Sequence, residues 1–299
     1  MFSDTQKQAL ERFVDLFFKE NEIANLSGCR DRKTFWRKHV VDAAMLDQLV
    51  RLHPGQKVVD IGTGGGLPGL VLAILHPKVS FVLVDSHRKK TDACERMRAE
   101  LGLANVTVVR GRAEKLGRDP AYRETFDWAV SRAVSALPVL LEYALPLVIP
   151  GGWFVSYKGP DPADEVAASR WPIKALGGRL DATRSFTLPE GDDQRSLVFV
   201  EKIGRTTKAF PRKCGAARKS PISEKEAQKA IDDRMRDLYA EKKGNGGPRR
   251  DGGPKGNSRG GGRGGSARPP RGRPPGGGGQ DRRDRGGFRR GSSGSAPVR

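Results

Sequence analysis

A glycine-rich loop sets the strongest limit on how this chain can fold. Residues 62–69 include five glycines and lie between an apolar run at 58–61 and a helical stretch at 70–75. Glycines allow the backbone to turn tightly and to approach a ligand closely. Ligands of open parallel sheets bind just beyond the carboxyl ends of the strands, where such a loop lies. The loop therefore predicts a strand–loop–helix unit with a ligand at the first strand of a parallel sheet.

The same alternation continues along the chain as far as residue 201. Helical stretches at 89–101 and 136–148 separate several of the strand candidates, which are the runs 58–61, 81–84, 106–109, 128–130, 153–157, 180–186 and 197–201. Strands connected through helices run parallel and are covered on both faces. The last two runs are separated by a short turn that contains Pro189 and Gly191, which favours an antiparallel pair. The pattern predicts an α/β, Rossmann-like sheet of about seven strands.

Composition and patterning divide the chain into four regions. Residues 1–50 predict an N-terminal helical extension, and 51–222 hold the α/β domain. A capping-box pattern that begins at Ser223 predicts a possible helix at 223–243. The region 244–299 contains 20 of the 38 glycines and almost no apolar side chains. Too little apolar surface is present there to offset the entropy of ordering, so we expect a disordered Arg/Gly-rich tail.

The charge of the chain points to a polyanionic partner. The net charge is +20, of which +11 falls in residues 244–299, and a nucleic acid is the natural partner of such a surface. A membrane surface is disfavoured because the tail has no amphipathic segment. No apolar run is long enough to span a membrane, and the N-terminus lacks the order of a signal peptide. We therefore expect a cytoplasmic protein without membrane contact. The cysteines and histidines lack metal-binding spacing, so we also expect no metal.

Three interpretations of the glycine loop compete. Gly64-x-Gly66-x-x-Gly69 matches a dinucleotide site, but its register is shifted from the end of the strand. A glycine-rich turn without a ligand is the second interpretation. The third is the loop that binds S-adenosylmethionine (SAM), which Asp60-x-Gly62-x-Gly64-x-Gly66 fits without a gap. SAM carries a cationic amino group and a sulfonium, so a nearby carboxylate is electrostatically reasonable. We favour SAM and hence a class I SAM-methyltransferase fold.

Residues at the ends of the next strands support this interpretation. Asp85 ends the second strand about 20 positions after the loop, which suits the ribose hydroxyls of an adenosine; a solvated aspartate is the alternative. Ala113 and Glu114 follow the third strand, where an adenine would lie. Arg132 ends the fourth strand and could meet the carboxylate of the cofactor or a phosphate of the substrate. A structural salt bridge is almost as good an explanation for Arg132.

Taken together, the motifs resemble those of the RsmG family, also called GidB, over roughly residues 10–222. The matching motifs are Asn25-Leu26-Ser27, Arg37-Lys38-His39-Val40-Val41-Asp42, the loop from Asp60 to Gly69, Val84-Asp85-Ser86, Arg112-Ala113-Glu114, Ser131-Arg132-Ala133, Pro150-Gly151-Gly152, Lys158-Gly159 and Pro211-Arg212-Lys213-x-Gly215-x-x-x-Lys219-x-Pro221. The resemblance implies a bacterial enzyme that methylates N7 of one guanine in 16S ribosomal RNA. It also implies cofactor contacts at Gly62, Leu67, Ala113, Glu114 and Arg132. Cys214, Ala217 and the tail depart from the family pattern.

The sequence offers no catalytic side chain, and this narrows the chemistry. The position after the fourth strand reads Ser131-Arg132-Ala133 instead of the Asp/Asn-Pro-Pro-aromatic turn of amine methyltransferases, and no cysteine lies where a nucleophile would be needed. Guanine N7 carries a free lone pair, so its methylation requires alignment rather than a general base. Alternatives from other classes are a non-catalytic RNA-binding protein on this fold and a SAM enzyme for another substrate.

Two basic regions are candidates for RNA binding. Cations cluster between residues 205 and 219 around Phe210, and among them we expect Arg212, Lys213 and Lys219 to contact RNA. An ordinary solvated terminal segment is the alternative there. Arg-Gly-Gly repeats in the tail favour RNA binding without sequence preference, although the tail could instead serve solubility. We expect 16S rRNA or the small ribosomal subunit as the partner and a monomer as the functional state.

Overall fold

The structure is a computed structural model in which residues 2–244 are described. These residues belong to one structural unit. The expected disordered tail at 244–299 lies, apart from Gly244, outside the described residues.

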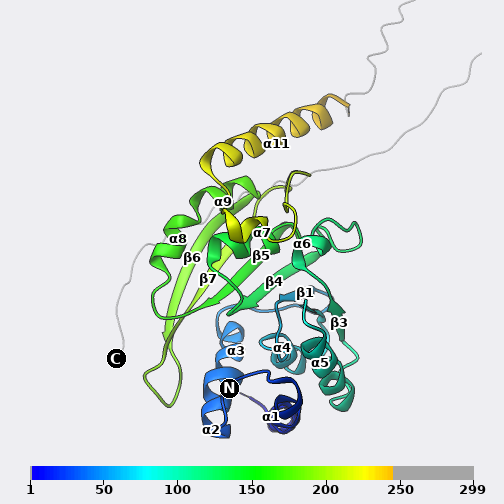
Figure 1. Cartoon of the computed structure of the whole chain (residues 1–299), viewed down its shortest axis with the longest axis vertical. Helices are drawn as coiled ribbons and strands as arrows, with labels where there is room; N and C mark the ends of the chain where they lie inside the picture. Colours follow the sequence, from blue (N-terminus) through cyan, green and yellow to red (C-terminus); the bar gives the residue numbers. More distant parts are fainter. Residues whose placement is uncertain (1, 245–299) are drawn as a thin grey trace, which may run out of the picture. The chain divides into compact units, whose positions relative to one another are not determined.

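The described part of the chain is built on a seven-stranded sheet (Figure 1). Its strand order is β3-β2-β1-β4-β5-β7-β6. The first five strands pair in parallel, whereas β7 is antiparallel to both β5 and β6. This confirms the α/β sheet of about seven strands with a closing antiparallel pair. The strands are β1 (Lys57–Ile61), β2 (Ser80–Asp85), β3 (Val106–Arg110), β4 (Phe126–Arg132), β5 (Val148–Lys158), β6 (Gly178–Thr187) and β7 (Gln194–Lys202).

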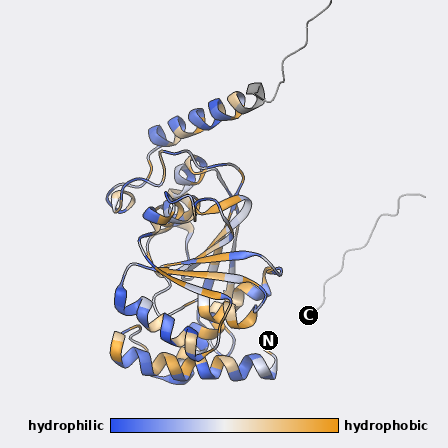
Figure 2. Ribbon diagram, turned by 90° about the vertical axis from the view of Figure 1, so that its right-hand side faces the viewer, coloured by the Kyte–Doolittle hydropathy of each residue, from blue (hydrophilic) through white to orange (hydrophobic). Residues whose placement is uncertain are grey.

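Helices cover both faces of the sheet, and each face has its own hydrophobic core. On one face the strands pack against α1 (Asp4–Ala24), α2 (Arg32–Phe35), the π-helix η1 (Trp36–Val41), α3 (Asp42–Ala44), the 3-10 helix η2 (Met45–Gln48), α4 (Gly69–Leu75) and α5 (Arg88–Glu100). On the other they pack against α6 (Ala113–Leu116), α7 (Leu137–Ala144), α9 (Arg170–Ala175), α10 (Ala216–Lys219) and the start of α11 (Glu224–Gly244), with α8 (Ala163–Ala168) beside α7 and α9. Figure 2 shows apolar residues along the strands between the two layers.

Alternation along β1 assigns its residues to opposite cores. Val58 belongs to the core under α1, α4 and α5, whereas Val59 and Ile61 belong to the core under α7. This is the period-two pattern of a strand that is covered on both faces. Asp60 therefore points to the same side as Val58, toward α4, and this orientation determines its role in the site.

The N-terminal helix is capped and packed as its sequence predicts. The Ser3 hydroxyl accepts a hydrogen bond from the backbone N–H of Gln6, whose side chain accepts one from the backbone N–H of Ser3. This reciprocal arrangement satisfies two backbone donors at the helix start. The residues that recur at helical spacing are all buried in the core that α1 shares with α4 and α5: Leu10, Phe13, Val14 and Phe17. The helix α1 thereby covers one end of the face that carries α4 and α5.

The parallel strand order reverses between β1 and β4. From β1 the chain proceeds outward to β2 and β3, then returns across the sheet to β4 on the other side of β1. Such a switch point leaves a crevice at the carboxyl ends of the strands, where ligands of open α/β sheets bind. The glycine loop follows β1 and lies at this crevice.

Candidate functional site

The glycine loop after β1 owes its shape to backbone conformation and to one buried carboxylate. Gly62, Gly64 and Gly66 have φ angles of 71°, 58° and 86°, a region that favours glycine. One carboxylate oxygen of Asp60, Oδ2, accepts hydrogen bonds from the Thr63 hydroxyl at 2.7 Å and from the Gly69 backbone N–H at 2.9 Å. These two bonds join the beginning of the loop to its end.

The buried position of Asp60 determines what its carboxylate does in the site. The side chain is fully buried, and burial raises its pKa to about 6. It does not line the cavity beside the loop. The expected carboxylate thus lies beside the loop, and the alternation of β1 turns it toward α4. Its structural role is to fix the loop.

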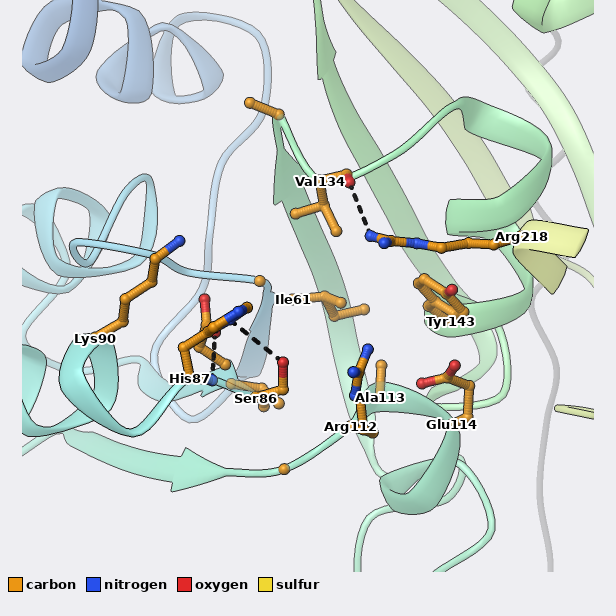
Figure 3. Close-up of a pocket in the computed structure, with 15 residues that line it drawn as sticks. Ile61, Ser86, His87, Lys90, Arg112, Ala113, Glu114, Val134, Tyr143 and Arg218 are labelled. Atoms are coloured by element: carbon orange, nitrogen blue, oxygen red, sulfur yellow. Dashed lines mark hydrogen bonds and ion pairs between the residues drawn. The ribbon is translucent and has the colours of Figure 1, made fainter. Parts of the chain in front are cut away.

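A cavity of about 390 Å³ lies beyond the carboxyl ends of β1, β2 and β3 (Figure 3). Four predicted cofactor residues line it: Gly62, Asp85, Ala113 and Glu114. Sequence reasoning missed His87, Lys90, Tyr143 and Arg218, which also line it. Figure 3 shows Glu114, Tyr143 and Arg218 on one side of this cavity and His87 and Lys90 on the other. We call it the first cavity.

The Asp85 carboxylate is fixed at the end of β2 by backbone donors. Its Oδ2 accepts from the Gly64 N–H at 3.1 Å, and its Oδ1 accepts from the His87 N–H at 2.9 Å. The side chain is only 7% exposed, so it is held in one place rather than solvated at a strand end. Gly64 therefore acts through its backbone by orienting Asp85. Gly64 itself is not among the residues that line the first cavity.

Leu67 and Arg132 also lie away from the first cavity. Leu67 is buried in the core on the α4 face. The guanidinium of Arg132 donates to Asp42 Oδ2 at 3.0 Å and lies 3.2 Å from His39 Nδ1. The sequence left a structural salt bridge open for Arg132, and the structure contains that salt bridge. The pairing spans 90 positions along the chain, so no local pattern could have identified its partner.

A second cavity, of about 620 Å³, adjoins the first. Ala133 and Val134 line both cavities. The other walls of the second cavity come from η1, α3, the ends of β4 and β5, α8 and β7. The residues that line it are Lys38, His39, Asp42, Arg132, Ala133, Val134, Ser135, Ala136, Tyr157, Lys158, Gly159, Glu165 and Arg195.

Four cations and two carboxylates are among the residues that line this second cavity. Burial, together with the neighbouring Arg132, Arg195 and Lys38, lowers the pKa of His39 to about 4. The imidazole is therefore neutral at physiological pH. Burial raises the pKa of Tyr157, whose hydroxyl donates to the backbone oxygen of Ala43. Neither side chain is placed to remove a proton from a bound molecule at neutral pH.

The basic segment after β7 lies against the first cavity. The Gly215 N–H donates to Glu114 Oε1 at 3.0 Å, and Arg218 Nη2 donates to the Val134 carbonyl oxygen at 3.4 Å. Ala217 is buried in the core beside α7. A segment that the sequence assigned to RNA binding alone therefore also forms a wall of the first cavity.

Two residues of this segment, Arg212 and Phe210, make structural contacts within the protein. Arg212 donates to both oxygens of the buried Glu142 and to Glu226 Oε1. Its guanidinium is thus committed within the protein, because each carboxylate occupies donors that a phosphate would need. Phe210 is 4% exposed and packs in the core, so it cannot stack on a base. Lys213 and Lys219 are exposed.

Within residues 2–244, no helix is both long and apolar enough to cross a membrane. The same residues contain no group of three or more His, Cys, Asp and Glu side chains that could hold a metal ion.

The sheet order, the antiparallel last strand and the glycine loop define a class I SAM-methyltransferase fold. A family model described as rRNA small subunit methyltransferase G (GidB) matches residues 6–197. The chain is 38% identical over 219 residues to ribosomal RNA small subunit methyltransferase G of Alkaliphilus metalliredigens, covering 73% of this chain and 92% of the relative. It is 41% identical over 220 residues to the protein of that name from Desulfitobacterium hafniense, covering 74% and 91%. The chain therefore belongs to the GidB family, which confirms the resemblance.

Among solved structures, the fold is similar to that of a SAM-dependent methyltransferase from Aquifex aeolicus. The TM-score is 0.44 at 18% sequence identity, and the match covers 62% of this chain and 97% of that one.

Proposed function

We propose that this protein uses SAM to methylate N7 of a guanine in 16S ribosomal RNA, free or within the small ribosomal subunit. The observation that carries the proposal is the pair of adjoining cavities. The first has the buried carboxylates expected around an adenosine, and the second is lined by cations that suit a nucleotide. Family membership supports the same assignment, because the relatives are named as methyltransferases of small-subunit ribosomal RNA.

The residues of the first cavity fit SAM. The oriented Asp85 carboxylate offers acceptors for ribose hydroxyls. Ala113 and Glu114, at the start of α6, would lie beside the adenine, and Gly62 would let the backbone approach the amino-acid part. When bound, SAM supplies an electrophilic methyl group on a sulfonium. Gly64 contributes by holding Asp85, and Leu67 by packing under the loop, so we propose indirect roles for both. We propose that Arg132 orients the wall shared by the two cavities.

The protein residues near the proposed transfer point position the acceptor and move no proton. Guanine N7 carries a lone pair and no proton, so accepting the methyl group that bound SAM would supply requires no proton to be removed by the protein. The residues that line the second cavity agree with a reaction that needs no base. The neutral His39 is hydrogen-bonded to Arg132, and Tyr157 is hydrogen-bonded to Ala43. Alignment of this kind can lower a barrier by about 7–11 kcal/mol.

The exposed cations of the described surface support RNA as the substrate. Lys213 and Lys219 lie beside the first cavity, on the segment that contacts Glu114 and Val134, and both are exposed. We propose that they contact phosphates, which position a nucleic acid without reading its sequence. We further propose that the protein acts as a monomer in the cytoplasm, without membrane or metal.

The experiment is incubation of the protein with radiolabelled SAM and unmethylated 16S rRNA, followed by nucleoside analysis. We expect 7-methylguanosine as the labelled product. RNA in which guanine is replaced by 7-deazaguanine should give no turnover, because the accepting lone pair is absent. Methylation of the 7-deaza RNA at an undiminished rate, or a different labelled nucleoside, would contradict the proposal.

A further inference from the structure

The second cavity contains a carboxylate of which only one oxygen accepts hydrogen bonds from the described residues. Glu165 on α8 lines the cavity. Its Oε2 accepts from the Leu137 N–H and from Lys158 Nζ, each at 2.6 Å. No described residue donates to Oε1, and the side chain is 39% exposed. Glu165 is therefore held in place through one oxygen while the other remains available to a ligand.

The other carboxylate in this cavity is not available. Asp42 is 4% exposed and has Arg132 at 3.0 Å from one oxygen and Arg195 at 3.8 Å from the other. Its charge is thereby compensated inside the protein. The remaining charged groups of the wall are all donors, and each also has a carboxylate of the protein within 4 Å: Lys38, Arg132, Lys158 and Arg195. A ligand that fills this cavity and has N–H donors of its own is therefore expected to place them at Glu165.

We propose that the second cavity receives the acceptor guanine and that Glu165 Oε1 recognises it by accepting hydrogen bonds from N1–H and the 2-amino group. This rests on the proposed function and adds the residue that selects the base. The size of the cavity, about 620 Å³, is within the range of small-molecule sites and leaves room for the attached sugar. One carboxylate oxygen has two lone pairs, enough for both donors.

This arrangement discriminates between bases. Guanine presents two adjacent donors on its Watson–Crick edge, whereas adenine presents an acceptor at N1 and no 2-amino group. An adenine in the same orientation would direct a lone pair at a carboxylate. The donors of the wall complement the guanine O6 acceptor and the phosphate of the same nucleotide. A site that hydrogen-bonds its substrate strongly rejects an analogue that lacks the matching group.

The same contact favours the reaction as well as binding. Methylation at N7 places positive charge on the purine ring, and N1–H becomes a stronger donor as that charge develops. A carboxylate at N1–H therefore binds the transition state more tightly than the guanine, which is the condition for an increase in kcat. Glu165 would touch the base without receiving its proton, so it is a recognition and charge-stabilising residue.

The test is a double-mutant cycle between Glu165→Gln and the replacement of the target guanine by inosine, which lacks the 2-amino group. With the wild-type protein, inosine should lower kcat/KM by about ten- to hundredfold, the range for loss of one charge-assisted hydrogen bond. With Glu165→Gln, methylation of guanine should fall similarly, and inosine should impose little further loss. Asp164→Asn is the matched control, because it removes one charge from the same helix at an exposed position outside the cavity; its inosine penalty should equal that of the wild type.

The outcomes separate this inference from the proposed function. If the wild-type protein forms no 7-methylguanosine, the function itself fails. If it forms 7-methylguanosine and the inosine penalty is equal in wild type and Glu165→Gln, the role of Glu165 is refuted. SAM affinity measured by calorimetry should remain within about twofold in both variants, which verifies the fold and the first cavity. Glu165→Ala provides a second cycle if the amide variant loses that affinity.

Discussion

At the scale of single residues, the glycine loop shows how one motif can serve two purposes. A side chain at Gly62 would place its Cβ 2.3 Å from a methyl carbon of Val134, and the φ of 71° adds backbone strain. Packing therefore requires a glycine at this position before any ligand is considered. A substitution at Gly62 would disturb the loop as well as the cofactor, so Asp85 is the cleaner probe of the first cavity.

We expect Asp85→Asn to weaken SAM binding by about ten- to hundredfold, the loss of roughly 1.4–2.8 kcal/mol that a charged acceptor contributes. The amide oxygen can still accept from the Gly64 or His87 N–H, so the fold should persist. Calorimetry measures the affinity, and thermal unfolding measures the stability. Unchanged affinity in the folded variant would show that the Asp85 carboxylate is not a cofactor ligand. Asp92→Asn is a matched control, because it changes an exposed carboxylate on α5 outside the cavity.

Lys202 provides a pH prediction at the same scale. The side chain is fully buried at the end of β7, donates to Leu145 O and lies 3.3 Å from Glu124. Burial lowers its pKa to about 7, against 10.5 when unfolded. Between these values the unfolded chain binds one proton more than the folded chain, so the free energy of unfolding rises with pH.

We expect the wild-type protein to become more stable from pH 7 to 8.5 and Lys202→Met to lose that slope. Urea unfolding at pH 7, 7.5, 8 and 8.5 measures the slope, and the difference between wild type and Lys202→Met isolates the contribution of this lysine. Lys208→Met, at an exposed position nearby, should retain the slope. If the two variants have the same pH dependence as the wild type, Lys202 is not the titrating group.

At the scale of elements, the sequence predicted local features well and long-range partners poorly. The strands, the glycine loop and the position of Asp85 follow from apolar runs and spacing, which are local. The pairings Asp42–Arg132 and Arg212–Glu142 join positions 90 and 70 residues apart, so no spacing rule reveals them. The orientation of Asp60 follows from the alternation of β1, whereas its partners Thr63 and Gly69 depend on how the loop folds back.

In the segment 210–219, composition alone does not show which residues face solvent and which face the protein. Its cations indicated one RNA-binding surface, yet only part of it faces solvent, because Phe210 and Ala217 anchor it in the core. Arg212 therefore lies on the protein side, whereas Lys213 and Lys219 remain exposed. This separation leads to a prediction in which neighbouring cations have opposite effects.

We expect Arg212→Ala to destabilise the protein by about 3 kcal/mol, because Glu142, 1% exposed, would be left buried without its partner. The double variant Lys213→Ala with Lys219→Ala should leave stability within about 0.5 kcal/mol. It should weaken RNA binding. The slope of log affinity against log salt should decrease by the amount that corresponds to about one to two phosphate contacts. Urea unfolding and RNA binding across a salt series measure both effects. The reverse pattern, with Arg212 controlling RNA affinity and the lysines controlling stability, would contradict this division.

At the scale of the whole molecule, the net charge is divided unevenly between the part of the chain that contains the two cavities and the tail. The two cavities and the segment beside them lie in residues 2–244, where a modest excess of cations surrounds specific sites. More than half of the net charge, +11 of +20, lies in residues 244–299 with three Arg-Gly-Gly repeats. We propose that the tail raises RNA affinity generally while the described part selects the guanine. Such attraction arises from the release of counterions from RNA and carries little sequence information.

Truncation after Lys243 tests this proposal. The tail carries 14 Lys and Arg, and each phosphate contact it makes contributes about 0.7–0.9 to the slope of log affinity against log salt. We therefore expect the truncated protein to bind RNA more weakly at low salt and to show a flatter slope. At saturating RNA its kcat should remain close to that of the full chain, because neither cavity contains tail residues among the described walls. Filter binding between about 50 and 200 mM salt measures the slope, and steady-state methylation at saturating RNA measures kcat. An identical slope in the two proteins would show that the tail does not contact RNA, whereas a large loss of kcat would place part of it in the reaction.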